Sequence, residues 1–237
     1  MMKKIIIYMA IHIFQSSPII IGILLCLTIF NLQTSIAQQV FQKTYGGTGE
    51  DTSYSIYQTA DGGYIFTGTT NSFGAGGNDV YLIRTDSIGD TLWTKAYGGT
   101  GSDHGRSVMQ TTDLGYIITG YTNSFGAGEY DVYLIKTDAN GNTQWTKTYG
   151  GAVYDAGSSV IQTTDGSYII TGVTESFGAG GADLYFIKAD ANGNKIWTKT
   201  FGGSAADHGN SVQQTSDNGY IIAGKTESFG AGGGMYI

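Results

Sequence analysis

Short segments rich in β-branched and aromatic residues follow one another from residue 41 onward, and clusters of Gly, Asp and Asn separate them. In the stretch that begins at Trp93, these segments cover residues 107–111, 116–119, 132–137 and 143–149. Such segments between turn residues predict β-strands. Residues 112–115 and 138–142 have the length and composition of hairpin turns, so we expect antiparallel neighbours.

The third predicted strand is apolar on both of its faces. Residues 132–135 read V-Y-L-I. A strand in a sheet with one face in water would alternate between apolar and polar residues. We therefore expect a sheet that is packed between two neighbouring sheets.

The four-strand pattern recurs with a period of 52 residues. Phe41, Trp93, Trp145 and Trp197 open the successive copies, and the copies from Trp93 and Trp145 are identical at 34 of 52 positions. A period near 50 with four strands is typical of a β-propeller. We predict an all-β propeller of four-stranded antiparallel blades, with about four blades in this chain. A β-solenoid is the alternative, although its coils are usually much shorter.

The two ends of the repeat array do not establish whether the predicted blades close into a ring. Residues 41–45 match the fourth strand of a blade, and the last copy stops at Met235-Tyr236-Ile237, within its third strand. The N-terminal strand could complete the last blade and close a four-bladed ring. The interpretation we favour is that the chain is part of a larger ring or associates with another copy, because an unpaired blade edge is open to association.

Residues 1–37 differ in kind from the repeats. Lys3 and Lys4 precede an apolar run over residues 19–30, and Ser35-Ile36-Ala37 forms a small-x-small cleavage site. This layout predicts a secretory signal peptide, and hence a secreted or cell-surface protein. An uncleaved anchor is the alternative, but the run is short for a membrane span of about 20 residues.

Removal of the signal peptide would leave a repeat domain over residues 38–237. Lipid attachment at Cys26, the single cysteine, is not expected, because Leu25 before it is not the small residue that a lipoprotein site needs. The domain of 200 residues is large enough to bury a core without disulfides. Its ten basic and nineteen acidic residues give a formal net charge of −9, which opposes binding to nucleic acid or to an anionic membrane.

Near-identical copies argue against catalysis, because an active site needs different groups in different roles. Gly99-Thr100-Gly101 lacks the Lys-Ser/Thr pair and the helix of a phosphate loop. The segment 138–142 resembles a calcium loop, but its glycine comes early and Tyr149 replaces the bidentate Glu. Arg84 and Arg106 are too few for the arginine cluster of a sialidase. We predict no catalytic, cofactor-binding or metal-binding residues.

Two kinds of side chain have both a functional and a structural interpretation. His104 and His208 are equivalent and each follows an Asp, and a His with a carboxylate at one place could bind metal, yet Thr52 and Ala156 hold the same position in the other copies. We therefore expect variable surface residues. The tryptophans that open the copies could stack on sugars, but their fixed strand position favours packing between blades.

One face of the predicted propeller collects acidic, Gly-rich loops, since the fourth-to-first and second-to-third connections emerge on the same side. Their aspartates are Asp51, Asp79, Asp103, Asp131, Asp155, Asp183 and Asp207. Loops on a rigid scaffold often carry binding residues, so a ring of carboxylates could hold calcium or a basic or sugar ligand. The interpretation we favour is that each Asp accepts hydrogen bonds from the amides of its own loop and fixes the turn.

The repeat motifs T-K-T-Y-G-G and S-F-G-A-G-G-x-D-V-Y-L-I-K-T-D-x-N-G carry a family resemblance. Over residues 41–237 the chain resembles the secreted β-propeller repeat proteins of bacteria and some archaea, including the group named for seven-bladed propeller repeats and surface proteins of the Bacteroidota. The resemblance implies an extracellular or cell-surface propeller, often within a longer protein that ends in a secretion-sorting domain. The printed sequence departs from that pattern, because its repeats run to the last residues.

The sequence thus favours a non-enzymatic, secreted or cell-surface propeller that acts as a structural or adhesive binding module. The alternative is a lectin-like propeller that binds carbohydrate or calcium through the Asp- and Gly-rich loop face. No cofactor is implied. The expected partner is an unidentified extracellular protein or glycan, and self-association through an incomplete end blade is a further expectation.

Overall fold

The structure is a computed structural model in which residues 41–230 and 234–236 are described. All of these residues belong to one compact unit within Val40–Ile237. The predicted signal peptide lies outside the described residues. All regular elements of the described residues are β-strands, and none of these residues forms a helix suited to crossing a membrane.

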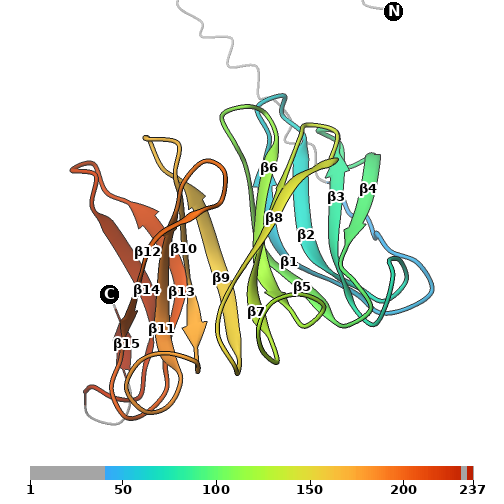
Figure 1. The fold of residues 1–237 in the computed structure, drawn as a ribbon. Helices are drawn as coiled ribbons and strands as arrows, with labels where there is room; N and C mark the ends of the chain where they lie inside the picture. Colours follow the sequence, from blue (N-terminus) through green and yellow to red (C-terminus); the bar gives the residue numbers. More distant parts are fainter. Residues whose placement is uncertain (1–40, 231–233, 237) are drawn as a thin grey trace, which may run out of the picture. The chain divides into compact units, whose positions relative to one another are not determined.

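The described residues form four antiparallel sheets, one for each copy of the repeat (Figure 1). The first sheet contains β1 (Asp51–Gln58), β2 (Tyr64–Thr70), β3 (Asp79–Thr85) and β4 (Thr91–Tyr97). The second contains β5 (Asp103–Gln110), β6 (Tyr116–Thr122), β7 (Asp131–Thr137) and β8 (Thr143–Tyr149). The third contains β9 (Asp155–Gln162), β10 (Tyr168–Thr174), β11 (Asp183–Ala189) and β12 (Lys195–Phe201). The fourth contains β13 (Asp207–Gln214), β14 (Tyr220–Thr226) and β15 (Gly234–Tyr236).

These sheets confirm an all-β chain with a repeat of about 52 residues and antiparallel neighbours in sequence order. The prediction for the first strand of the second copy was wrong at its start, because β5 begins at Asp103 rather than at residue 107. A register shift between Gly105 and Ser107 interrupts its pairing with β6, so the four residues before Ser107 do not follow a simple strand pattern. The strand predicted at 41–45 is also not formed.

A glycine in each second strand permits the close approach at this irregularity. A Cβ atom on Gly120 of β6 would overlap the carbonyl oxygen of His104 on β5. The equivalent glycines Gly68, Gly172 and Gly224 meet the backbone of their first strands in the same way. Any other residue would push the first strand away from the second.

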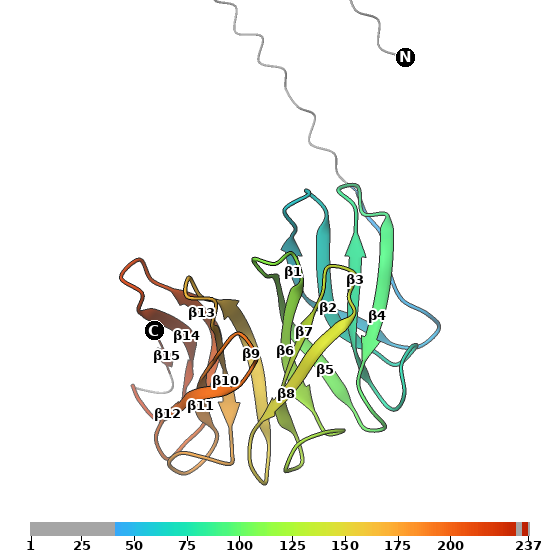
Figure 2. The same ribbon diagram turned by 45° about the horizontal axis from the view of Figure 1, so that its top comes forward.

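The sheets pack against one another in chain order, and Figure 2 shows the same sequence of neighbours from a second direction. Three apolar clusters fill the three junctions between successive sheets. The third strand β7 is buried along its whole length, which confirms that the second sheet is covered on both faces. Trp93 packs on Tyr116 and Trp145 on Tyr168 of the next sheet, each with ring centroids 5.8 Å apart, as predicted for packing residues.

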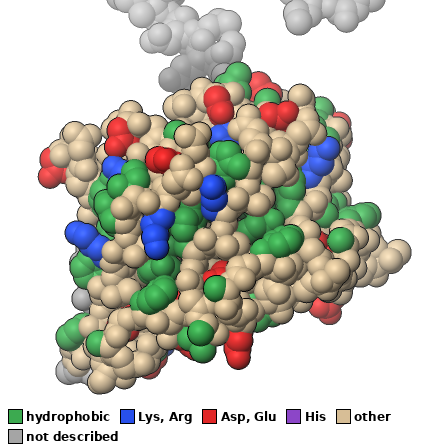
Figure 3. Space-filling model, viewed as in Figure 1, with side chains coloured by type: hydrophobic (Ala, Val, Ile, Leu, Met, Phe, Trp, Pro, Cys, Tyr) green, Lys and Arg blue, Asp and Glu red, His purple; other side chains and the backbone are tan. Residues whose placement is uncertain are grey.

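The surface is chemically mixed. On the face drawn in Figure 3, apolar side chains reach the surface in separate patches, with both basic and acidic groups beside them. The net negative charge of the sequence is therefore not gathered into one acidic area on this face. A binding site on this face must therefore be identified from local geometry, because no extended region of uniform charge marks one.

Candidate functional site

The aspartates of the Gly-rich loops are turned into the protein. Asp103 is buried, and its Oδ2 atom accepts hydrogen bonds from Gly99 N at 2.8 Å and from Ser124 Oγ at 2.6 Å. The same loop amide donates to Asp51, Asp155 and Asp207 in the other copies. In the second type of loop, Ala127 N donates to Asp131 Oδ2 at 2.7 Å. These carboxylates hold their own loops, as the favoured interpretation of the sequence required.

Loop carboxylates also approach one another at the junctions between sheets. A Cβ atom on Gly98 would overlap the carboxylates of both Asp79 and Asp103. Burial raises the pKa of Asp79, and the nearby charge of Asp103 raises it further. Five loop aspartates have a buried Oδ1 atom without a hydrogen-bond partner among the described residues: Asp51, Asp79, Asp103, Asp155 and Asp207. In the same part of the chain, no three His, Cys, Asp or Glu side chains are grouped to hold a metal ion.

A different site forms where the first strands of the four sheets converge. An open cavity of about 370 Å³ is bordered by β1, β5, β9 and β13, together with β6 and β10. Its lining residues are Tyr54, Arg106, Tyr121, Tyr154, Ala156, Gly157, Ser158, Val173 and His208. We call this space the first-strand cavity. Each sheet contributes at least one lining residue, so the cavity exists only in the assembled array.

Arg106 is the charged group of the first-strand cavity. Its guanidinium carbon lies 4.1 Å from the ring centroid of Tyr54 and 5.3 Å from that of Tyr121. Its Nη2 atom donates a hydrogen bond to the Tyr121 hydroxyl at 2.9 Å. Among the described residues no carboxylate forms an ion pair with Arg106, whereas Arg84 pairs with Asp61. Arg106 thus presents a positive charge that is held by aromatic rings and is not neutralised by an acid.

Aromatic and imidazole rings surround this charge. His104 stacks on Tyr121 with ring centroids 4.5 Å apart, and its Nδ1 atom lies 3.2 Å from Thr69 Oγ1. Burial lowers the pKa of His104, and the Arg106 charge lowers it further. Burial raises the pKa of Tyr154 to about 12. At neutral pH His104 and Tyr154 are therefore uncharged.

The first-strand cavity is also where the copies of the repeat differ. The position of Arg106 holds Tyr54, Ser158 and Asn210 in the other copies. The position of Tyr121 holds Thr69, Val173 and Lys225, and the position of Tyr154 holds Glu50, Ser102 and Ala206. The surrounding framework is nearly identical between the central copies, whereas these lining positions are not. The array therefore presents one asymmetric site rather than the same group several times.

Sequence reasoning missed this site. It treated His104 and His208 as variable surface residues, whereas His208 lines the cavity and His104 is half-buried against Tyr121. It also considered Arg106 only as one of two arginines, too few to form the arginine cluster of a sialidase. The sequence does show which positions differ between the copies. These positions can be recognised as one site only once the fold brings the first strands together.

Comparisons with known proteins place the chain only loosely. No family model matches it. It is similar to the regulatory protein FlaEY of Caulobacter vibrioides, with 27% identity over 228 aligned residues, 80% of this chain and 23% of that protein. The chain thus spans about a quarter of the length of this curated relative. Among solved structures it is similar to a protein of unknown function from Bacteroides caccae, with 10% identity, a TM-score of 0.44, and coverage of 72% and 52% of the two chains.

Proposed function

We propose that the four sheets are successive blades of a β-propeller, and that the protein is a non-enzymatic binding module outside the cell or on its surface. The four-stranded unit of about 52 residues and the convergence of the first strands on one cavity support the architecture. The signal-peptide pattern of residues 1–37 supports export.

The observation that carries the binding role is the unneutralised Arg106 between aromatic rings. A guanidinium binds a carboxylate through two parallel hydrogen bonds, and the faces of Tyr rings pack on the C–H face of a sugar. The ligand class that fits this combination is a carboxylate-bearing glycan, such as a chain of uronic acids. The cavity lining contains no carboxylate among the described residues, whereas glycoside hydrolysis uses a pair of them. Binding without turnover is therefore the proposed activity.

Isothermal titration of the purified protein with an oligomer of glucuronic or galacturonic acid tests this proposal, with the matching neutral oligosaccharide as ligand control. We expect saturable binding of the acidic oligomer alone. Arg106→Gln should weaken it about 10-fold or more, because a hydrogen bond to a charged group contributes about 1.5–3 kcal/mol. Lys195→Gln removes an equal charge from an exposed site at the start of β12 and should leave the affinity unchanged. Equal affinity for both oligosaccharides, or cleavage of the acidic one, would overturn the proposal.

A calcium-dependent role of the loop face is the second candidate. The buried, unpartnered Oδ1 atoms of Asp79 and Asp103 favour it, since both carboxylates lie beside Gly98. Calcium should then raise the melting temperature, and Asp103→Asn should abolish the shift. Asp217→Asn, at an exposed turn of the fourth sheet, is the control. An unchanged melting temperature at millimolar calcium contradicts this role.

A further inference from the structure

The two end sheets expose the surfaces that the inner sheets bury. On the side of each sheet that faces the next one, Ile65, Ile117 and Ile169 occupy equivalent positions and are all 0% exposed. The equivalent residue of the fourth sheet, Ile221, is 46% exposed. We call this side of the fourth sheet the trailing face.

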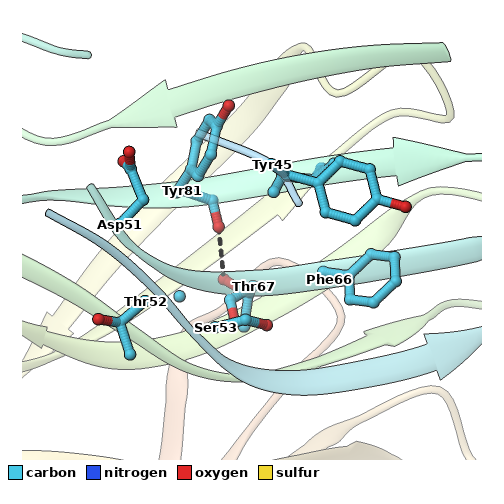
Figure 4. A pocket seen from close by; sticks show the side chains of 9 residues that line it. Tyr45, Asp51, Thr52, Ser53, Phe66, Thr67 and Tyr81 are labelled. Carbon is cyan, nitrogen blue, oxygen red and sulfur yellow. Dashed lines mark hydrogen bonds between the residues drawn. The ribbon is translucent and has the colours of Figure 1, made fainter. Parts of the chain in front are cut away.

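The opposite side of the first sheet shows the complementary exposure. Val108, Val160 and Val212 point toward the preceding sheet and are 3–4% exposed, whereas the equivalent Ile56 is 57% exposed. Tyr45, Phe66, Tyr81 and Ile83 line a small cavity of about 60 Å³ on this side (Figure 4). We call it the leading face.

Residues 41–45 cover part of the leading face in the place of a preceding sheet. The Tyr45 hydroxyl donates to the Gly89 carbonyl at 2.8 Å, as the Tyr97 hydroxyl of β4 donates to Gly141 of the second sheet at 2.7 Å. Phe41 lies against Gly89, as Trp93 lies against Gly141. The segment thus repeats the contacts that a fourth strand makes with the next sheet, although it belongs to no described sheet.

Polar contacts at the inner junctions are also periodic. The Oε1 atoms of Gln110, Gln162 and Gln214 each accept a hydrogen bond from a turn amide of the preceding sheet, at 2.8 to 3.0 Å. The corresponding groups on the two end faces are Gln58 on the leading face and the Ser216 amide on the trailing face. Likewise, Ser55, Ser107 and Ser159 accept hydrogen bonds from amides of the following sheet. Ser211 and the Ile56 amide are the matching pair across the ends.

We propose that the trailing face of one chain binds the leading face of a second copy, in the geometry of the three inner junctions. The argument is complementarity, because apolar residues and hydrogen-bonding groups on the two faces are those that already meet three times within the chain. The faces are different from each other, so the contact is head-to-tail rather than two-fold symmetric. Residues 41–45 of the second copy would then lie where the fourth sheet lacks a described fourth strand, beside β15.

A head-to-tail contact predicts a result that a symmetric contact cannot give. Ile56→Lys disables the leading face and Ile221→Lys disables the trailing face, and both residues are exposed, so both variants should fold. The unaltered protein should associate in light scattering after size exclusion, and each variant alone should have the mass of one chain. An equimolar mixture retains one intact leading and one intact trailing face per pair, so it should form a dimer and nothing larger. Ile196→Lys, at a 51% exposed position on β12, should associate like the unaltered protein.

Three results would overturn this proposal. The unaltered protein could stay monomeric at about 1 mM, which would mean that its end faces are covered by each other or by further residues of the chain. Either single variant could remain a dimer, which would point to a symmetric contact elsewhere. The mixture could stay monomeric although both variants keep the circular dichroism of the unaltered protein, which would mean that the two faces do not recognise each other.

Discussion

A comparison of the second and fourth sheets shows that the sequence of a strand alone does not determine how deeply the strand is buried. β6 reads Y-I-I-T-G-Y-T and β14 reads Y-I-I-A-G-K-T, a difference of two residues in seven. β6 is buried at six of its seven positions, whereas β14 alternates between exposed and half-covered positions until its last residue. β6 lies between two sheets and β14 has a described neighbour on one face. The comparison shows that the neighbour, rather than the strand sequence, determines whether these isoleucines form a core.

The largest contrast is expected from one substitution made in both strands. Ile117→Ala should lower the free energy of unfolding by about 2–5 kcal/mol, because it opens a cavity between two sheets. Ile221→Ala should lower it by less than about 1 kcal/mol, because that side chain is already near water. Urea denaturation in dilute solution, where chains do not associate, measures both. Equal losses would show that the trailing face is covered in the monomer.

Loss of an ion pair should also lower the free energy of unfolding more in the second sheet than in the fourth. The buried Lys136 ammonium contacts the Asp113 carboxylate at 2.8 Å, whereas Lys225 and Glu227 of the fourth sheet form an exposed pair. Asp113→Asn leaves a buried charge without its partner and should cost about 1–3 kcal/mol of unfolding free energy. Glu227→Gln should have no measurable effect. A matching loss in both variants would contradict the burial argument.

The Asp113 pair also predicts a pH dependence. Although burial raises the pKa of Asp113, the hydrogen bonds from Lys136 and Thr111 lower it below its ordinary value. A carboxyl with a lowered pKa stabilises the fold above the pKa of the unfolded chain, about 3.9, and loses this contribution as the pH falls further. The stability difference between the unaltered protein and Asp113→Asn should therefore shrink below about pH 4. A difference that is constant from pH 7 to pH 2.5 would contradict it.

The smallest contrast concerns the hydrogen bonds between sheets. Gln110→Ala removes the acceptor of the Ala60 amide at an inner junction and should cost about 0.5–1.5 kcal/mol. Gln58→Ala removes the equivalent side chain from the leading face and should change the monomer by less than about 0.5 kcal/mol. The same urea titrations resolve this difference when the free energy of unfolding depends on urea concentration with the same slope in both variants. A larger loss of unfolding free energy for Gln58→Ala than for Gln110→Ala would show that Gln58 has a hydrogen-bond partner on the leading face, contrary to this expectation.

The sequence predicted those features that depend on neighbours along the chain. Hairpin turns, strand composition and the 52-residue period identified the four-stranded antiparallel units, and the apolar run 132–135 identified the two-sided burial of the second sheet. The start of β5 was missed because the irregular pairing at Gly105 removes the strand pattern. Residues 41–45 were predicted as a strand from their likeness to β4, but a strand also needs a paired edge, which their own sequence does not supply.

The candidate site depends on relations that the sequence does not display. Arg106 lies on β5, Tyr121 on β6 and Tyr154 just before β9, and their meeting follows from how the four first strands and their neighbours converge. The loop aspartates illustrate the opposite case. Their hydrogen-bond partners lie within a few residues or in the adjoining loop, so a role in fixing turns could be predicted from spacing alone.

The first-strand cavity has a consequence for how such a protein changes over generations. Most of its wall is built from positions at which the copies already differ, whereas the junctions rest on other positions that are nearly invariant between copies. In the binding role proposed above, a substitution at Arg106 or Tyr154 would alter the ligand that the cavity accepts while the apolar clusters between the sheets stay intact. Exchange of a single copy of the repeat would replace one part of this wall, because each sheet contributes its own lining residues. Under that proposal, binding and stability depend on separate sets of residues, so that a new ligand specificity would not require a change in the packing between the sheets.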